Sequence, residues 1–196
     1  MNPVLSSNTF FIKEHVGMFK AANNFDILDP VSGAIVMECR EENLGLFTKL
    51  LRFTDYKRMT PFDIQVRTPD GQPVLRITRG VSIFLSRVTV QDEQGRIVGG
   101  FKQKFFSIGG AFEVLDATGQ MLCRLQGKWT GWEFKFLRPD NREVACVTKK
   151  WAGLAKEMFT TADNYMLTVT PEIAPQDSIR NLVLAAVLCI DMVLKE

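Results

Sequence analysis

The sequence predicts an all-β fold, either a closed antiparallel barrel or a sandwich, with one apolar helix near the C-terminal end. Two observations support this prediction. A short pattern recurs along most of the chain, in which an alternating apolar segment runs into Asp and Gly and then into a second apolar segment. Alternation with a period of two makes a half-buried strand, and Asp, Asn and Gly supply the positive φ of a tight hairpin. The second observation is the long apolar run that begins at Leu182.

The predicted hairpins follow one another along the chain. They pair 25–29 with 33–37, 62–66 with 70–75, 88–92 with 95–98, and 112–116 with 119–122, and a degenerate copy covers 134–144. Segment 41–60 is the least regular and predicts a long hairpin loop or a bent strand. A propeller is excluded because one blade takes roughly 40–45 residues, which leaves too few blades to close. The pairs Gly99-Gly100 and Gly109-Gly110 predict bulges within strands.

The C-terminal segment predicts a helix over 177–195, which Asp177 and Ser178 would cap. Every residue from Leu182 to Ile190 is apolar, so this helix must be surrounded by protein or by lipid. About sixteen helical residues span about 24 Å, whereas a bilayer core is about 30 Å thick. Asp191 would also be costly in lipid. We therefore expect a core helix inside one domain of residues 1–196.

The composition and motifs of the chain exclude several classes of function. The net charge of +2 is too small to indicate a nucleic-acid partner. His15 is the only histidine, and neither a nucleophile elbow nor a P-loop occurs, so we expect no catalytic residues and no metal site. From the residues at its two ends we expect no signal peptide, no N-myristoylation and no prenylation. The four cysteines form no CxxC pair, which indicates a reducing compartment: Cys39, Cys123, Cys146 and Cys189.

One stretch resembles a known family. The run Lys150-Trp-Ala-Gly-Leu-Ala-Lys-Glu-Met-Phe-Thr-Thr-Ala-Asp-Asn-Tyr165 resembles the phospholipid scramblase family, and so does the end from Cys189 to Glu196. The hairpins at Phe25 and Phe112 are similar to that family's early and central hairpins. The resemblance implies the fold of the tubby C-terminal domain and the plant LURP-one-related proteins. That fold is a closed barrel of about 12 strands around a buried helix, which leaves no free sheet edge.

The resemblance also implies a function. Scramblases are described as calcium-responsive proteins that move phospholipids between leaflets, and tubby domains bind phosphoinositide headgroups. It therefore implies phospholipid binding, with transbilayer phospholipid movement, by a cytoplasmic protein at the inner face of a membrane. The implied partner is anionic phospholipid or a membrane surface. The alternative is a soluble tubby-like binding module for a protein or small ligand, with no scrambling activity.

Two of the family's sites are degraded in this sequence. In the calcium segment, Thr161 replaces the first acidic residue and Met166 replaces a turn glycine, which leaves Asp163 and Glu172. Calcium takes about six to eight oxygen ligands, so this segment predicts no cofactor. The family's cysteine cluster has no counterpart near Phe105, and we expect the chain to lack the proline-rich N-terminal extension of the larger members. We therefore expect a minimal form of the barrel.

Basic residues supply the candidate headgroup site. Lysines beside tryptophan suit an anionic membrane interface, where the indole ring lies at headgroup level. Trp129 and Trp132 follow one such lysine, and Trp151 lies within a cluster of three. The alternative is a solvated barrel face whose charges discourage edge pairing. The candidates are Lys102, Lys104, Lys128, Lys149, Lys150 and Lys156.

Overall fold

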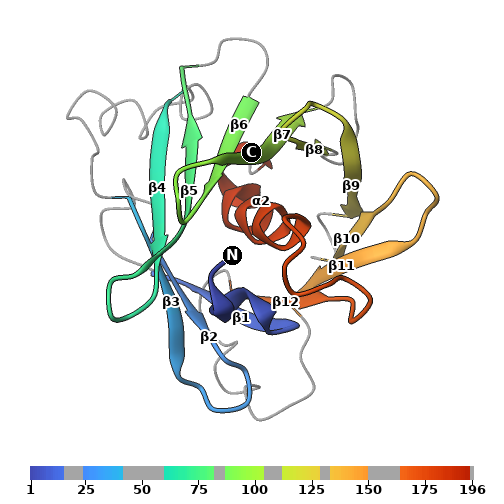
Figure 1. Cartoon of the computed structure of the whole chain (residues 1–196). Helices are drawn as coiled ribbons and strands as arrows, with labels where there is room; N and C mark the ends of the chain where they lie inside the picture. Colours follow the sequence, from blue (N-terminus) through green and yellow to red (C-terminus); the bar gives the residue numbers. More distant parts are fainter. Residues whose placement is uncertain are drawn as a thin grey trace.

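The computed structural model describes residues 1–15, 24–41, 60–81, 87–103, 112–128, 133–149 and 164–194. Within these ranges the chain forms twelve strands, one short 3-10 helix and one α-helix (Figure 1). The helices are η1 (Pro3–Ser6) and α2 (Ile179–Leu194). The strands are β1 (Thr9–Glu14), β2 (Phe25–Leu28), β3 (Ile35–Arg40), β4 (Phe62–Arg67), β5 (Pro73–Arg79), β6 (Arg87–Asp92), β7 (Ile97–Gln103), β8 (Phe112–Asp116), β9 (Met121–Lys128), β10 (Glu133–Leu137), β11 (Glu143–Thr148) and β12 (Tyr165–Val169).

The strands close into a barrel. Each strand pairs antiparallel with the next one along the chain, and β1 pairs with β12 to complete the ring. In that closing pair Phe10 lies opposite Leu167 and Ile12 lies opposite Tyr165. The predicted fold, with its twelve strands and one enclosed helix, is therefore confirmed, and of the two architectures the chain adopts the barrel.

Tight turns join the strand pairs at one end of the barrel, which we call the hairpin end. In the turn after β8, the Asp116 Oδ1 atom accepts the N–H groups of Thr118 and Gln120 at 2.8 and 2.9 Å. Gly119 completes this turn with a φ of 87°. A residue with a Cβ atom would be strained in this conformation, whereas glycine adopts it readily. Positive φ recurs in the equivalent turns at Gly33, Gly71, Gly95 and Asn141, as the hairpin pattern predicted.

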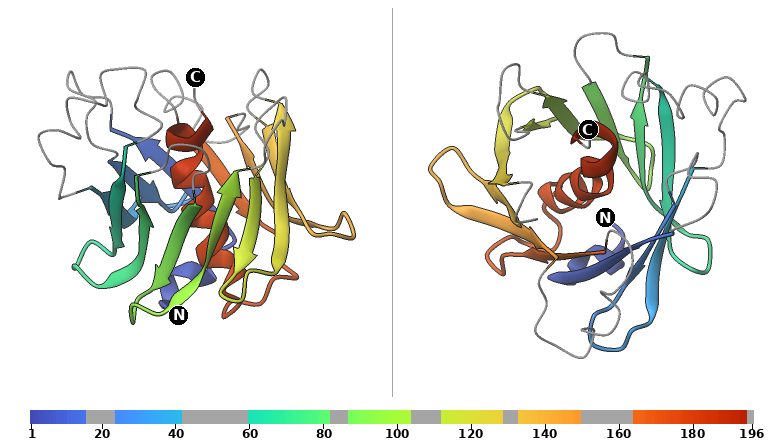
Figure 2. Two further views of the ribbon diagram at one scale, coloured as in Figure 1. Left: turned by 90° about the horizontal axis from the view of Figure 1, so that it is seen from above. Right: turned by 180° about the vertical axis from the view of Figure 1, so that it is seen from behind.

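The helix α2 occupies the inside of the barrel. In Figure 2 (left) it runs from the hairpin end, marked N, toward the end marked C. Every residue from Ile179 to Cys189 is at most 3% exposed, which confirms the predicted core helix. The helix begins two residues later than predicted, because Asp177 lies outside it and caps it: its Oδ1 atom accepts the N–H of Ile179 at 3.0 Å.

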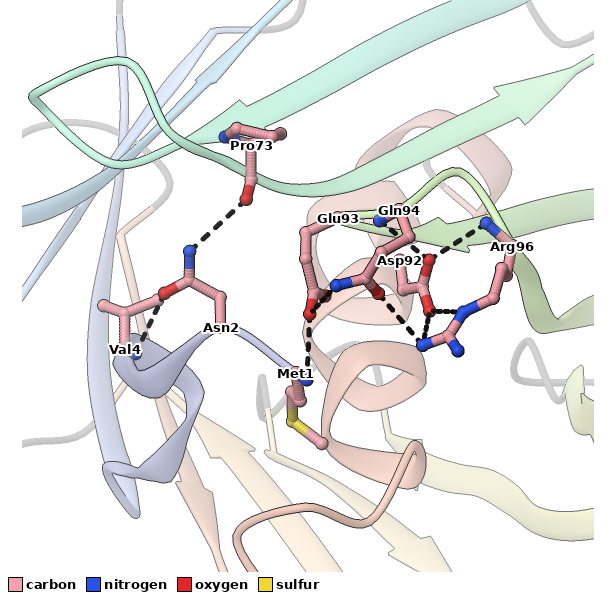
Figure 3. A network of polar contacts seen from close by, with 8 residues as sticks. All are labelled: Met1, Asn2, Val4, Pro73, Asp92, Glu93, Gln94 and Arg96. Carbon is pink, nitrogen blue, oxygen red and sulfur yellow. Dashed lines mark hydrogen bonds and ion pairs between the residues drawn. The ribbon is translucent and has the colours of Figure 1, made fainter.

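The first residues of the chain cover the hairpin end. The side-chain amide of Asn2 donates to the carbonyl oxygen of Pro73 at 3.3 Å, and its Oδ1 atom accepts the N–H of Val4 at 3.1 Å (Figure 3). The Met1 amine lies 2.8 Å from Glu93 Oε1, next to the turn that joins β6 and β7. These contacts fix η1 across the turns that follow β4 and β6.

Some predictions fall outside the described residues. The irregular segment 41–60 lies outside them except for its two end residues, and so do Gly109-Gly110 and Trp151. Asp191 belongs to α2, but its side chain is likewise not described.

Candidate functional site

The topology brings three of the predicted lysines to the same end of the barrel. Strands β7, β9 and β11 all start at the hairpin end and finish at the opposite end, which we call the rim end. Lys102 lies at the end of β7, Lys128 is the last residue of β9, and Lys149 directly follows β11. The other three candidates, Lys104, Lys150 and Lys156, lie outside the described residues.

The strand register decides which charges stand beside these lysines. Lys102 is exposed, and it lies opposite Arg87 of β6 on one side and Glu113 of β8 on the other. The backbone of Lys128 pairs with that of Glu133. The rim end is therefore a mixed surface, in which Arg87 and Lys102 form a cross-strand pair of like charge.

Lys149 occupies a different environment. Its ammonium nitrogen lies 5.3 Å from the centre of the Tyr165 ring, in a cation–π contact between the end of β11 and the start of β12. The residue is half-buried, so part of its side chain is enclosed by the protein. Such a contact stabilises an exposed cation by about 0.5–1 kcal/mol. Lys149 therefore contributes to the barrel's own structure as well as to the charge of the rim end.

The histidine belongs to a structural ion-pair cluster. His15 Nε2 lies 2.7 Å from Asp26 Oδ2, and Arg40 Nη2 lies 2.6 Å from Asp26 Oδ1. Burial raises the pKa of Asp26, but hydrogen bonds from Arg40 and His15 together outweigh it and hold this pKa below its usual value. Arg40 also donates to the carbonyl oxygen of Phe25 at 2.6 Å. The cluster thus fastens β1, β2 and β3 together.

The four cysteines carry no activated thiol. All four are free, and burial raises the pKa of each one, in the case of Cys123 to about 12. Cys39 and Cys189 are completely buried, and burial raises the pKa of both thiols well above the usual range. A nucleophilic cysteine needs a thiolate at neutral pH, and these thiols are protonated.

The segment that resembles a calcium site is only partly described. Asp163 lies outside the described residues, and Glu172 is exposed in the turn after β12. Among the described residues, no three His, Cys, Asp or Glu side chains come together in a way that could hold a metal ion.

One feature of the barrel wall was not predicted. A groove of about 340 Å³ runs over the outer face of β6, β7 and β8, and Arg87, Gly100 and Leu115 are among its lining residues. The signal in the sequence was the pair Gly99-Gly100, which we interpreted as a bulge. The register of β6 against β7 shifts beside Gly99, so the predicted bulge is present. The groove over Gly100 could not be predicted in the same way, because it depends on which residues of three neighbouring strands face outward.

Comparisons with known proteins identify the family. A family model described as Scramblase matches residues 5–196. A phospholipid scramblase family protein of Schizosaccharomyces pombe is 24% identical over 191 residues, which cover 90% of this chain and 50% of that protein. The chain therefore spans about half the length of this curated relative.

The fold has a counterpart among solved structures. An X-ray structure of an Arabidopsis thaliana protein superposes with a TM-score of 0.53 at 14% sequence identity, over 98% of this chain and 94% of that one. At this identity the likeness shows the shared fold alone. Because the family model covers nearly the whole chain, the protein belongs to the scramblase family.

Proposed function

We propose that this protein binds anionic phospholipid at a membrane surface through cations at the rim end of its barrel. The observation that supports this best is the convergence of Lys102, Lys128 and Lys149 at one end, from three alternate strands. Each cation near an anionic surface contributes about 1 kcal/mol of binding. Membership of the scramblase family, and a relative whose name includes phospholipid, support phospholipid as the ligand class.

The enclosed position of α2 limits how the protein can contact a bilayer. Within the described residues, we find no helix with both the length and the apolar character needed to cross a membrane. The residues from Ile179 to Cys189 are enclosed by the barrel, so lipid contact by this helix would first require the barrel to open. We therefore propose surface binding as the primary activity, and transbilayer movement of phospholipid as a second step that needs its own test.

The free cysteines favour a reducing compartment. All four thiols remain unpaired, which is typical of proteins on the cytoplasmic side of a membrane. We propose a peripheral location at the cytoplasmic face, where anionic lipid is concentrated.

Co-sedimentation with liposomes tests the proposed binding. Purified protein is mixed with neutral phosphatidylcholine vesicles, and with the same vesicles carrying phosphatidylserine or a phosphoinositide, each with and without calcium. We expect pelleting only with anionic lipid, and weaker pelleting at high salt, because salt screens exposed charges. Pelleting with neutral lipid at high salt would instead indicate insertion of apolar surface. No pelleting under any condition would contradict the proposal and favour a soluble binding module.

Matched variants locate the binding surface. Lys102→Gln removes one exposed rim cation, and we expect about fivefold weaker binding to anionic vesicles. Arg142→Gln removes one cation at the hairpin end, where Arg142 lies 2.7 Å from Asp140, and we expect unchanged binding. Equal losses in the two variants would contradict a rim-directed orientation. A fluorescent-lipid assay in reconstituted vesicles then tests transbilayer movement separately.

A further inference from the structure

A groove lies on the outer wall, over the row of residues that contains Gly100. Thr89, Gly100 and Leu115 lie opposite one another on β6, β7 and β8. The flanking residues Val88 and Phe101 are buried in the core, so the row through Gly100 faces outward. Thr89, Gly100 and Leu115 all line this groove, which has a volume of about 340 Å³.

Close strand packing requires this glycine. A Cβ atom at residue 100 would lie 1.9 Å from the carbonyl oxygen of Val88, which belongs to the backbone of β6. At residue 99 a Cβ would lie 2.1 Å from the carbonyl oxygen of Leu115. The groove floor is therefore rigid backbone, which gives a pre-formed site.

The row through Gly100 differs from two other regions of the described outer wall, which carry ion pairs. On β2 to β5 that wall carries ion pairs, such as Arg40 with Asp26 and Arg76 with Asp63. On β10 and β11 it carries Lys135 paired with Glu143 at 3.0 Å. Between these two regions, the row Thr89, Gly100 and Leu115 contains no charge.

The charges at the rim side of the groove are unbalanced. Arg87 lines the groove and lies directly opposite Lys102, and like charges in such a cross-strand pair repel each other. Among the described residues, neither cation takes part in an ion pair or hydrogen bond, and Glu113 is the one acid that lies opposite Lys102. At the hairpin side, Asp116 uses Oδ1 to accept the turn N–H groups. An anion bound between Arg87 and Lys102 would relieve the repulsion.

We infer that this groove binds the headgroup of an anionic glycerophospholipid, and this inference rests on the proposed function. The phosphate would lie between Arg87 and Lys102, where a guanidinium can donate two parallel hydrogen bonds to it. The glycerol region would pack over Gly100 and against Leu115. A volume of about 340 Å³ lies near the lower limit of ligand pockets, about 300–1,000 Å³, which suits a headgroup and leaves the acyl chains outside.

Two independent variants test the groove. Arg87→Gln removes the phosphate-binding guanidinium, and its matched control is Arg142→Gln, which removes an exposed arginine at the hairpin end. Thr89→Trp fills the groove without a change of charge, and its matched control is Gln126→Trp, at an exposed position on β9. We expect at least fivefold weaker binding to phosphatidylserine vesicles for both groove variants, and unchanged binding for both controls. Melting temperatures show that each variant is folded.

A soluble probe separates the groove from the membrane surface. Short-chain dihexanoyl phosphatidylserine, below its micelle concentration, is titrated into labelled protein and followed by amide chemical shifts. We expect shifts at Gly100, Thr89 and Leu115, and their loss in Thr89→Trp. Inorganic phosphate is titrated in parallel, and equal affinity for it would overturn the lipid assignment in favour of a free-anion site.

The outcomes distinguish this inference from the proposed function. Vesicle binding that survives in both groove variants would overturn the groove and leave rim binding intact. No vesicle binding by the unaltered protein would overturn the proposed function, and the short-chain titration would then decide the groove by itself. Shifts confined to residues away from β6, β7 and β8 would overturn it.

Discussion

The guanidinium of Arg180 donates a hydrogen bond from Nη2 to the side-chain oxygen of Asn8 at 2.7 Å, although 172 positions separate the two residues. The same side chain donates to the carbonyl oxygens of Leu5, Ser7 and Ile173 at 3.2, 2.9 and 2.7 Å. Arg180 is 3% exposed, and burial lowers its pKa. One buried cation thus fastens the first turn of α2 to the segment before β1 and to the loop after β12.

Replacement of Arg180 by Met should destabilise the barrel. The variant keeps the apolar stem but leaves several buried carbonyl oxygens without a donor, so we expect a loss of about 2–4 kcal/mol in the free energy of unfolding. For a chain of this size, each kcal/mol lowers the melting temperature by about 2–4 °C. Urea unfolding and thermal melts measure both quantities.

Arg142→Met is the control for this prediction. The Arg142 side chain is 79% exposed and pairs with Asp140 in a surface turn, so its removal should cost less than about 0.5 kcal/mol. Equal losses in the two variants would show that the Arg180 contacts add nothing to stability.

Gly100→Ala should be far more damaging than a typical glycine substitution. The new Cβ would lie 1.9 Å from the carbonyl oxygen of Val88, and neither strand can move without breaking the β6–β7 register. We expect a loss above about 3 kcal/mol or failure to fold. Gly71→Ala is the matched control, because nothing lies within 4 Å and only the φ of +86° opposes it, at about 1 kcal/mol. A comparison of urea midpoints measures the difference, and similar midpoints would contradict the prediction.

The fold was predictable because its signals are local. Alternation in segments such as Phe62–Arg67, together with Asp and Gly in the turns, specifies each hairpin without knowledge of the rest of the chain. A series of hairpins must then cover its edges, and the apolar segment after Leu182 supplies the core. The resemblance to the scramblase family selected the barrel, and the pairing of β1 with β12 closes it.

The site was less predictable because it depends on contacts between distant segments. Arg180 is an ordinary polar residue in the sequence, and its five acceptor groups belong to residues at both ends of the chain. Alternation also fails at Phe11, which is 1% exposed on the outer side of β1, where it clusters with Leu28 and Met166. Similarly, the contact of Lys149 with Tyr165 and the pairing of Arg87 with Lys102 follow from strand register, which local patterns do not specify.

The buried thiols predict a simple labelling pattern. Cys39, Cys123 and Cys189 are fully buried with raised pKa values, so an aromatic disulfide reagent should not label them in the native protein. Cys146 is half-buried, and it should be the one described cysteine that reacts, slowly because its pKa is also raised. Cys146→Ser should abolish native-state labelling and leave three reactive thiols in denaturant. Rapid labelling that persists in this variant would show that the barrel opens readily.

The Asp26 cluster predicts loss of stability in acid. Hydrogen bonds from Arg40 and His15 hold the pKa of Asp26 below its ordinary value of 3.8, against the effect of burial. The folded protein therefore binds this proton more weakly than the unfolded chain does, so the contribution to stability is full above about pH 4 and is lost as the pH falls through the lowered pKa.

Urea unfolding of the unaltered protein and of Asp26→Asn, over a pH series, measures this contribution. We expect the unaltered protein to be the more stable at neutral pH, and the difference to shrink below about pH 4. The turn aspartates Asp29, Asp116 and Asp140 also have lowered pKa values but are present in both proteins, so the difference isolates Asp26. A difference that stays constant over the whole series would contradict the assignment.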